Sequence, residues 1–338
     1  MRLSEIGGEF GFIERMRGPH AAAKGGGLAV PVGDDAAVLD APAGRQVVVT
    51  TDMLVEDVHF RREWSDPYSI GWKAAAVNLS DIAAMGAEPT FAFLSLGLTE
   101  QDTVESLDRL YDGFSDCLHR YGARLAGGDT NASPHGLIVS VTQLGTVEAG
   151  RALTRSGARV GDALLVTGTL GDAAGGLLLL TQHGPARAEK ISRDLIGAHR
   201  RPHPRVPAAR AAAATGNVRA AMDLSDGLAG DLPKLCAASG VGARIEVSKL
   251  PVSDALRQAA KDLGKDPAAL ALSGGEDYEL LLSVAPADVE AVRTAMDAVG
   301  VPSAVIGEVT RAGLHVVAPD GSETDLSAED HGWDHFAP

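Results

Sequence analysis

The stretch AVNLSDIAAMGAEP at residues 76–89 decides the fold of the first half of the chain. Its small and apolar residues have the spacing of a buried helix, and Gly86 ends that helix. One carboxylate, Asp81, lies in the middle, four residues from both Val77 and Met85, so the three share one stripe. An unpaired buried carboxylate is costly, so we expect Asp81 to be protonated, paired with a cation or bound to a metal.

Helical and strand patterns are mixed on both sides of this segment. Strands are predicted at 45–60, 90–98, 137–148 and 163–168, and helices at 69–86 and 104–122. The strands alternate in character, which is typical of partly solvated sheets. The pattern predicts an α/β (α+β) chain with mixed sheets and helices.

Length, charge and cysteine content narrow the class of protein. The chain has 338 residues, enough for about two domains. It has 45 acidic and 30 basic residues, a net charge of −15, which argues against nucleic acid or an anionic membrane as a partner. Cys117 and Cys236 suggest neither a disulfide framework nor a zinc motif. With no signal-peptide pattern and no apolar run near the ~20 residues of a membrane span, we expect a cytoplasmic protein.

A polar, basic connector, AGRALTRSGARVGD, spans residues 149–162. It places the domain boundary near its start, with an N-terminal domain at 1–149 and a C-terminal domain at 150–338. We found no internal repeat of the solenoid type.

Two basic segments have ordinary structural interpretations. Arg151, Arg155 and Arg159 repeat at every fourth position of the connector, which fits a solvated helix face as well as a cation for phosphates. The stretch HRRPHPRVP at 199–207 predicts a solvated proline-rich loop, to which we assign no catalytic role.

Short acidic motifs beside glycine or a hydroxyl residue recur through both halves. They are VGDDAAVL (32–39), TTD (50–52), LSD (79–81), GGDT (127–130), DLSDG (223–227) and GGEDYE (274–279). Any one of them can be an ordinary turn, and Asp81 can also cap a short helix. However, almost no lysine accompanies the set, so salt bridges cannot absorb all of its acids.

The chemistry of these motifs suits phosphate bound with a divalent cation. Asp oxygens are hard ligands for Mg²⁺, which shares its coordination sphere with substrate phosphates. Adjacent glycines let backbone amides approach phosphate oxygens. The chain has no P-loop, GxGxxG or kinase motif set. The motifs therefore predict a site with several magnesium ions, and spacing alone does not identify the phosphates.

The same motifs resemble those of the thiamine-monophosphate kinase family, within a superfamily of ATP-binding proteins that includes aminoimidazole ribonucleotide synthetase. The resemblance runs from GEFGFIERM (8–16) to GWDHF (332–336) and depends most on VNLSDIAAMGA, TRSGA and SGGEDYEL. It implies a two-domain aminoimidazole ribonucleotide synthetase-like fold with the active site in the inter-domain cleft. The N-terminal domain would bind ATP and Mg²⁺ and form a homodimer, and the C-terminal domain would complete the ATP and substrate site.

The implied reaction transfers a phosphoryl group from ATP to thiamine monophosphate, giving thiamine diphosphate and ADP. The acceptor phosphate has a second pKa near ~6, so it is largely ionised at neutral pH and needs no general base. Catalysis would then rest on positioning and on charge stabilisation by Mg²⁺ in a direct in-line transfer.

Position by position, the resemblance assigns roles to individual residues, none of them a catalytic acid or base. Magnesium ligands are implied at Asp35, Thr50, Thr51, Asp52, Asp81, Asp129, Asp223 and Asp226. ATP contacts are implied at Tyr111, Gly128, Asp129, Arg155 and Ser225, and substrate contacts at His59, Glu276 and Trp333. From the residues alone, Tyr111 and His59 can also be structural, and Trp333 can simply pack the tail.

Other interpretations stay open on the sequence. An aminoimidazole ribonucleotide synthetase-like enzyme shares the superfamily motifs, although the SGGEDYEL and GWDHF segments argue against it. A selenophosphate synthetase-like enzyme generally has an N-terminal Cys or selenocysteine, and no cysteine precedes Cys117. A non-catalytic sensor of Mg·ATP would not need so many metal ligands.

Overall fold

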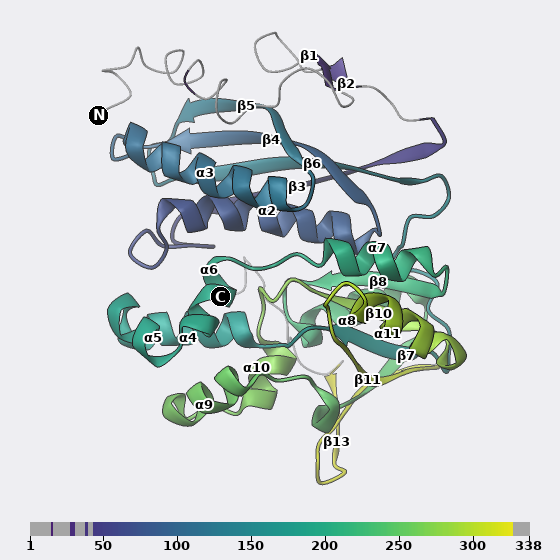
Figure 1. Cartoon of the computed structure of the whole chain (residues 1–338). Helices are drawn as coiled ribbons and strands as arrows, with labels where there is room; N and C mark the ends of the chain where they lie inside the picture. Colours follow the sequence, from purple (N-terminus) through teal and green to yellow (C-terminus); the bar gives the residue numbers. More distant parts are fainter. Residues whose placement is uncertain (1–14, 16–27, 31–37, 40–42, 327–338) are drawn as a thin grey trace. The chain divides into compact units, whose positions relative to one another are not determined.

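The computed structural model describes Arg15 and residues 28–30, 38–39 and 43–326 (Figure 1). The chain divides into two compact units, Met1–Ile82 with Ala87–Gly150, and Ala83–Gly86 with Arg151–Pro338. The expected domains, 1–149 and 150–338, divide at almost the same place. The end of the helix that contains Asp81 groups instead with the second unit.

The first unit is built on a four-stranded sheet. Its strands are β3 (Arg45–Val55), β4 (Glu88–Leu98), β5 (Arg124–Ala132) and β6 (Ile138–Glu148), in the order β3-β6-β4-β5. Only the β4–β5 pair is parallel. A separate antiparallel pair joins β1 (Leu28–Val30) to β2 (Val38–Leu39).

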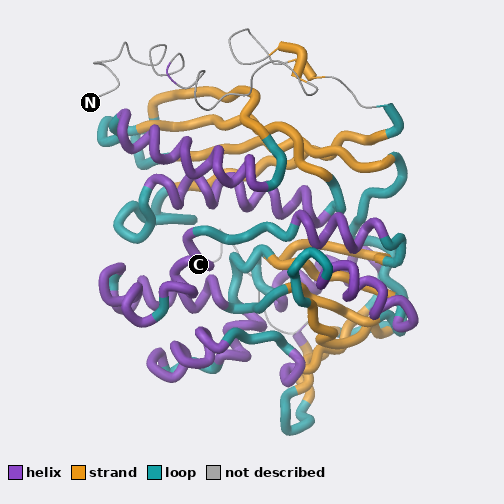
Figure 2. Tube along the Cα trace, viewed as in Figure 1, coloured by secondary structure: helices purple, strands orange, loops and turns teal. Residues whose placement is uncertain are grey.

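Two helices, α2 (Pro67–Ala84) and α3 (Val104–Arg120), run along the same face of this sheet (Figures 1 and 2). Helix α2 ends as predicted, because Gly86 takes a left-handed φ of 65° and its amide donates to Ala83 O at 2.7 Å. Helix α3 begins with a capping box between Thr103 and Ser106.

The two helices approach each other through glycine. A Cβ built on Gly71 of α2 would lie 1.9 Å from Leu110 O, and one built on Gly113 of α3 would lie 1.9 Å from Tyr68 O. Each glycine therefore lies so close to the backbone of the opposite helix that there is no room for a side chain.

The second unit is built on a seven-stranded sheet in the order β13-β12-β9-β11-β7-β10-β8, in which only β9 and β12 pair in parallel. Its strands are β7 (Ala163–Thr167), β8 (Val218–Leu224), β9 (Gly242–Glu246), β10 (Glu279–Val284), β11 (Ser303–Thr310), β12 (Leu314–Val317) and β13 (Glu323–Asp325).

Helices of the second unit surround that sheet (Figure 2). They are α4 (Asp172–His183), α5 (Pro185–Ile191), α6 (Arg193–Arg200), α7 (Val206–Ala214), α8 (Leu228–Ser239), α9 (Asp254–Leu263), α10 (Pro267–Ser273), α11 (Val289–Asp297) and the 3₁₀ turns η2 (Val247–Lys249) and η3 (Pro286–Asp288). The core packs Leu232 and Leu235 of α8 against strand residues such as Ile245 and Leu281. None of the helices in the described part of the chain is long and apolar enough to cross a membrane.

The predicted α/β class is confirmed, and two local expectations are wrong. Arg151, Arg155 and Arg159 lie in an extended connector rather than on a helix face. The segment 199–207 is not a solvated loop, because His199 is buried and Arg205 forms an ion pair with the buried Glu279. A buried carboxylate requires such a partner, which draws the arginine inward.

We expect Gly113→Ala to destabilise the protein by about 1–3 kcal/mol, because the added methyl must push α2 and α3 apart. Urea unfolding followed by circular dichroism measures the loss. Gly197→Ala in α6 is the control, since none of the described atoms lies within 4 Å of its added Cβ. That variant should be neutral or slightly stabilised, and equal effects of the two substitutions would contradict the packing argument.

Candidate functional site

Strand β3 and helix α2 bring three of the predicted ligands together. Thr50 and Asp52 are two apart in β3, so they point to the same face of the sheet. The hydroxyl of Thr50 donates to Asp81 Oδ2 at 2.5 Å, which identifies that face as the one next to α2. The structure thus gives Asp81 a hydroxyl partner and a neighbouring carboxylate. We call Thr50, Asp52 and Asp81 the β3–α2 cluster.

The cluster is electrostatically costly when it holds no cation. Burial and, to a smaller extent, the neighbouring charge of Asp81 together raise the pKa of Asp52 to about 6. Two carboxylates that oppose each other's ionisation, supported by a hydroxyl, form an all-oxygen donor set. Such a set fits Mg²⁺, whose sphere is completed by water and phosphate oxygens.

The side chain of Thr51 points to the opposite face of β3. Its hydroxyl donates to Val141 O at 2.9 Å and accepts from Thr142 Oγ1 at 3.4 Å. Because side chains alternate along a strand, neighbouring threonines cannot both turn toward α2. The Thr51 hydroxyl is therefore separate from the β3–α2 cluster.

Strand register also separates Asp129 from the β3–α2 cluster. Asp129 of β5 is aligned with Ser95, which is aligned with Ser140 and then Met53, so it belongs to the Met53 face of the sheet. Asn131 Nδ2 donates to Asp129 Oδ2 at 2.7 Å. The preceding Gly128 passes so close to β4 that an added Cβ would lie 1.9 Å from Leu94 O.

The segment after β3 positions His59. Its Nδ1 accepts a hydrogen bond from the Val55 amide at 3.1 Å, which assigns the ring proton to Nε2 in the neutral form. Lys73 is buried, with only 3% of its surface exposed. Its Nζ lies 3.4 Å from the His59 carbonyl oxygen. The sequence analysis missed Lys73, although it lies on the same four-residue spacing as Asp81.

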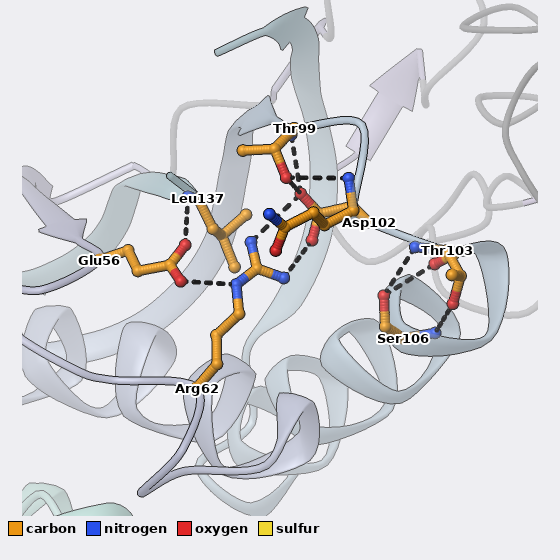
Figure 3. A network of polar contacts seen from close by, with 8 residues as sticks. Glu56, Arg62, Thr99, Asp102, Thr103, Ser106 and Leu137 are labelled. Carbon is orange, nitrogen blue, oxygen red and sulfur yellow. Dashed lines mark hydrogen bonds and ion pairs between the residues drawn. The ribbon is translucent and has the colours of Figure 1, made fainter. Parts of the chain in front are cut away.

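An arginine network fixes the same segment (Figure 3). Arg62 donates to Glu56 at 2.8 Å and to Asp102 at 2.6 and 3.3 Å, and Glu56 in turn accepts from the Leu137 amide at 2.7 Å. Asp102 also accepts from the amide of Thr99 at 2.7 Å. The network ties the His59 segment to the strand ends around it.

Two predicted ATP contacts occupy very different surroundings. Tyr111 lies in the buried face of α3, where burial raises the pKa of its hydroxyl. Arg155 lies in the connector with an exposed side chain, and its carbonyl oxygen accepts from Ser239 Oγ at 2.8 Å. Asp35 and Trp333 lie outside the described residues.

In the second unit, the loops 223–227 and 274–278 lie side by side. Asp223 is the penultimate residue of β8 and is buried, and β8 pairs with β10. The amide of Glu276 donates to Ser225 O at 2.8 Å, and the amide of Tyr278 donates to Leu224 O at 2.9 Å. The structure therefore brings Ser225 and Glu276 together on adjoining loops, with Asp223 two residues before Ser225 in β8.

A lysine that the sequence analysis missed pairs with the first of these loops. Lys234 of α8 contacts Asp226 Oδ2 at 2.5 Å and Asp231 Oδ1 at 2.8 Å. Asp226 is thus one acid of the set that a salt bridge does absorb, and the three-residue spacing of Asp231 and Lys234 on a helix was the available signal. Among the described residues, no group of three or more His, Cys, Asp or Glu side chains could hold a metal ion.

Family models match both units. The AIR synthase related protein, N-terminal domain, matches residues 33–147, and the AIR synthase related protein, C-terminal domain, matches residues 159–318. The fold and the acidic loops therefore define an AIR synthase related protein.

Individual similar proteins indicate which family of AIR synthase related proteins the chain belongs to. The thiamine-monophosphate kinase of Escherichia coli (strain K12) is 42% identical over 90% of this chain and 91% of its own length. That of Bacillus subtilis (strain 168) is 38% identical over 91% and 93%. The crystal structure of the enzyme from Stenotrophomonas maltophilia K279a is 39% identical, with a TM-score of 0.80 over 88% of this chain and 93% of that chain. AaThiL complexed with AMPPCP and TMP is 33% identical, with a TM-score of 0.75 over 99% of both chains. The chain belongs to the thiamine-monophosphate kinase family.

The raised pKa of Asp52 predicts a pH-dependent stability. Between about pH 4 and pH 6 the folded state keeps a proton that the unfolded state has released, so stability falls as pH rises through this window. In magnesium-free buffer, Asp52→Asn should therefore be more stable than wild type by about 3 kcal/mol well above pH 6. The difference should vanish near pH 4.

Urea unfolding from pH 4 to pH 8 measures this difference. Glu100→Gln, at an exposed loop position of the same unit, is the control and should follow wild type throughout. If Asp52→Asn and wild type lose stability in parallel as the pH rises, the Asp52 assignment is wrong.

Proposed function

We propose that this chain transfers the terminal phosphoryl group of ATP to thiamine monophosphate, forming thiamine diphosphate and ADP. The observation that carries the proposal is the β3–α2 cluster, in which Asp52 and Asp81 oppose each other's ionisation beside the hydroxyl of Thr50. Acids kept together at such a cost are typical of sites that bind cations and phosphates. Membership of the thiamine-monophosphate kinase family supplies the substrates.

Residues of both units would hold magnesium. The β3–α2 cluster fits it best. The resemblance adds Asp35, Thr51, Asp129, Asp223 and Asp226, of which Thr51 and Asp129 lie on the opposite face of the sheet and so would not share an ion with the cluster. Bound Mg²⁺ would neutralise the charge of the phosphates and of the acids. The structure describes the side chains of all these residues except Asp35, and their donors are all oxygens.

The chain's own groups would act by positioning. The acceptor phosphate is already ionised near neutral pH, so no side chain has to remove a proton. Gly128, with Tyr111, Asp129, Arg155 and Ser225, would contact ATP, since a glycine beside a strand edge lets a backbone amide approach phosphate. Reaction then depends on holding donor and acceptor in line.

His59, Glu276 and Trp333 would contact thiamine monophosphate. The conformation of His59 is fixed by the Val55 amide and the buried Lys73, and that of Glu276 by the Ser225 carbonyl. Residues held this firmly suit a binding site, because little entropy is lost when the ligand arrives.

We also propose that the protein forms a homodimer through the open face of the β3-β6-β4-β5 sheet. Val47, Val49 and Met53 alternate along β3 on that face with 55%, 60% and 53% of their surface exposed. Val49 is aligned with Leu144, which extends the face onto β6. Apolar side chains gathered on one sheet face favour contact with a second copy.

We place the reaction in the cytoplasm. Both cysteines, Cys117 and Cys236, are free and buried, which fits a reducing compartment.

The function is tested by following thiamine diphosphate formed from ATP, Mg²⁺ and thiamine monophosphate, with thiamine as a parallel acceptor. Wild type should use thiamine monophosphate, and Asp81→Asn should lower kcat by about 100-fold or more because one charge of the site is lost. Glu100→Gln is the matched control and should keep wild-type kcat. A wild type that produces no thiamine diphosphate rejects the proposal, and an Asp81→Asn variant with normal magnesium-dependent turnover rejects the role of Asp81.

The dimer is tested by sedimentation velocity. Val49→Asp places a charge in the exposed apolar face and should convert the dimer to a monomer. Val299→Asp, a substitution at a 44% exposed valine of the second unit, should remain dimeric. A wild type that sediments as a monomer at micromolar concentration rejects the proposed interface.

A further inference from the structure

Glu276 has a backbone conformation that its own side chain does not favour. Its φ is 70°, in the left-handed region, and Tyr278 two residues later has a φ of 52°. Such angles are unfavourable in a residue other than glycine, and they persist where surrounding contacts enforce them. Here the amides of Glu276 and Tyr278 donate to the carbonyl oxygens of Ser225 and Leu224.

The neighbouring acids Glu276 and Asp277 of this loop have different roles. The carboxylate of Asp277 accepts from the Gly171 amide at 2.6 Å and the Ala173 amide at 3.3 Å, at the start of α4. That acid has a structural role as a helix cap. Glu276 turns elsewhere, and its side chain is 26% exposed, so a ligand can reach it.

His199 lies against the carboxylate of Glu276. Its Nδ1 is 3.1 Å from Glu276 Oε2, at ion-pair distance, and only 4% of its side chain is exposed. The residue belongs to the last turn of α6, where a protonated histidine is favoured by the helix dipole. The contact is therefore one of ion-pair distance, without a hydrogen bond from Nδ1 to that oxygen.

Close helix packing fixes the place of His199. A Cβ built on Gly176 of α4 would lie 2.1 Å from Leu195 O and 3.0 Å from His199 Cβ. The glycine therefore lets α6 rest directly on α4, which fixes the backbone position from which the His199 side chain extends. A side chain held in this way can act on a neighbour with little loss of entropy.

We propose that His199 is a positioning residue for the acceptor substrate: it holds one carboxylate oxygen of Glu276, so that Glu276 meets thiamine monophosphate in a single orientation. This inference rests on the proposed function, in which Glu276 contacts that substrate. The thiazolium ring is a cation and the aminopyrimidine carries N–H donors, so an oriented carboxylate is a suitable partner for either group. His199 is the first residue of the segment 199–207, so that segment would begin beside the substrate-contacting Glu276.

The test compares KM for thiamine monophosphate with KM for ATP and kcat. His199→Leu removes the charged ring that faces Glu276 and should raise KM for thiamine monophosphate about tenfold, because the carboxylate can then take other orientations. KM for ATP should change less than twofold. His199→Asn, whose amide can replace Nδ1, should stay close to wild type, whereas His199→Gln places its amide further out and should resemble His199→Leu.

Two controls separate this role from simple packing. His119→Leu, at an exposed histidine in the last turn of α3, should leave every constant unchanged. In a Glu276→Gln background, His199→Leu should add less than twofold to KM, because the carboxylate that it orients is gone.

The outcomes are distinguishable. A wild type that makes no thiamine diphosphate rejects the proposed function before any variant is compared. An active wild type with unchanged KM for thiamine monophosphate in a folded His199→Leu variant overturns the positioning role, as does full additivity with Glu276→Gln. If His199→Leu does not fold, equal KM values for the Asn and Gln variants overturn it instead.

Discussion

The hydrogen bond from Thr50 to Asp81, at 2.5 Å, joins the sheet of the first unit to helix α2 and holds an acid in a largely apolar setting. Asp52 lies on the same face of β3, so the contact also keeps two carboxylates close together. Burial and the charge of Asp81 raise the pKa of Asp52 to about 6. A chain that maintains this cluster gives up stability at neutral pH, which is common where a site must bind a cation.

The second unit also holds several acids close together, and their partners are basic side chains and backbone amides. Its acids lie on the adjoining loops 223–227 and 274–278, where Lys234 pairs with Asp226 and His199 lies against Glu276. Asp277 is used for the start of α4. Asp226, Glu276 and Asp277 thus each have a defined partner, and the left-handed φ of Glu276 shows that the backbone is constrained to produce this arrangement.

Much of the fold could be predicted, because hydrophobic periodicity is a local property. The helix around Asp81 and the strand that contains Thr50 were both expected within a few residues of their observed ends. Lys73, His199 and Lys234 were not recognised as important. The reason is physical: a basic residue on an apolar stripe signals that it needs a partner, but the partner comes from a distant part of the chain.

By itself, the sequence determined the α/β class, the oxygen-rich chemistry of the acidic motifs and the residues available to bind phosphate. Only the tertiary structure decided which acids share a face. Strand alternation guarantees that Thr50 and Thr51 point to opposite sides, yet the packing of α2 determines which side contains Asp81. Strand order likewise aligns Asp129 with Met53 rather than Asp52. Such choices depend on how sheets and helices pack, and no local pattern encodes them.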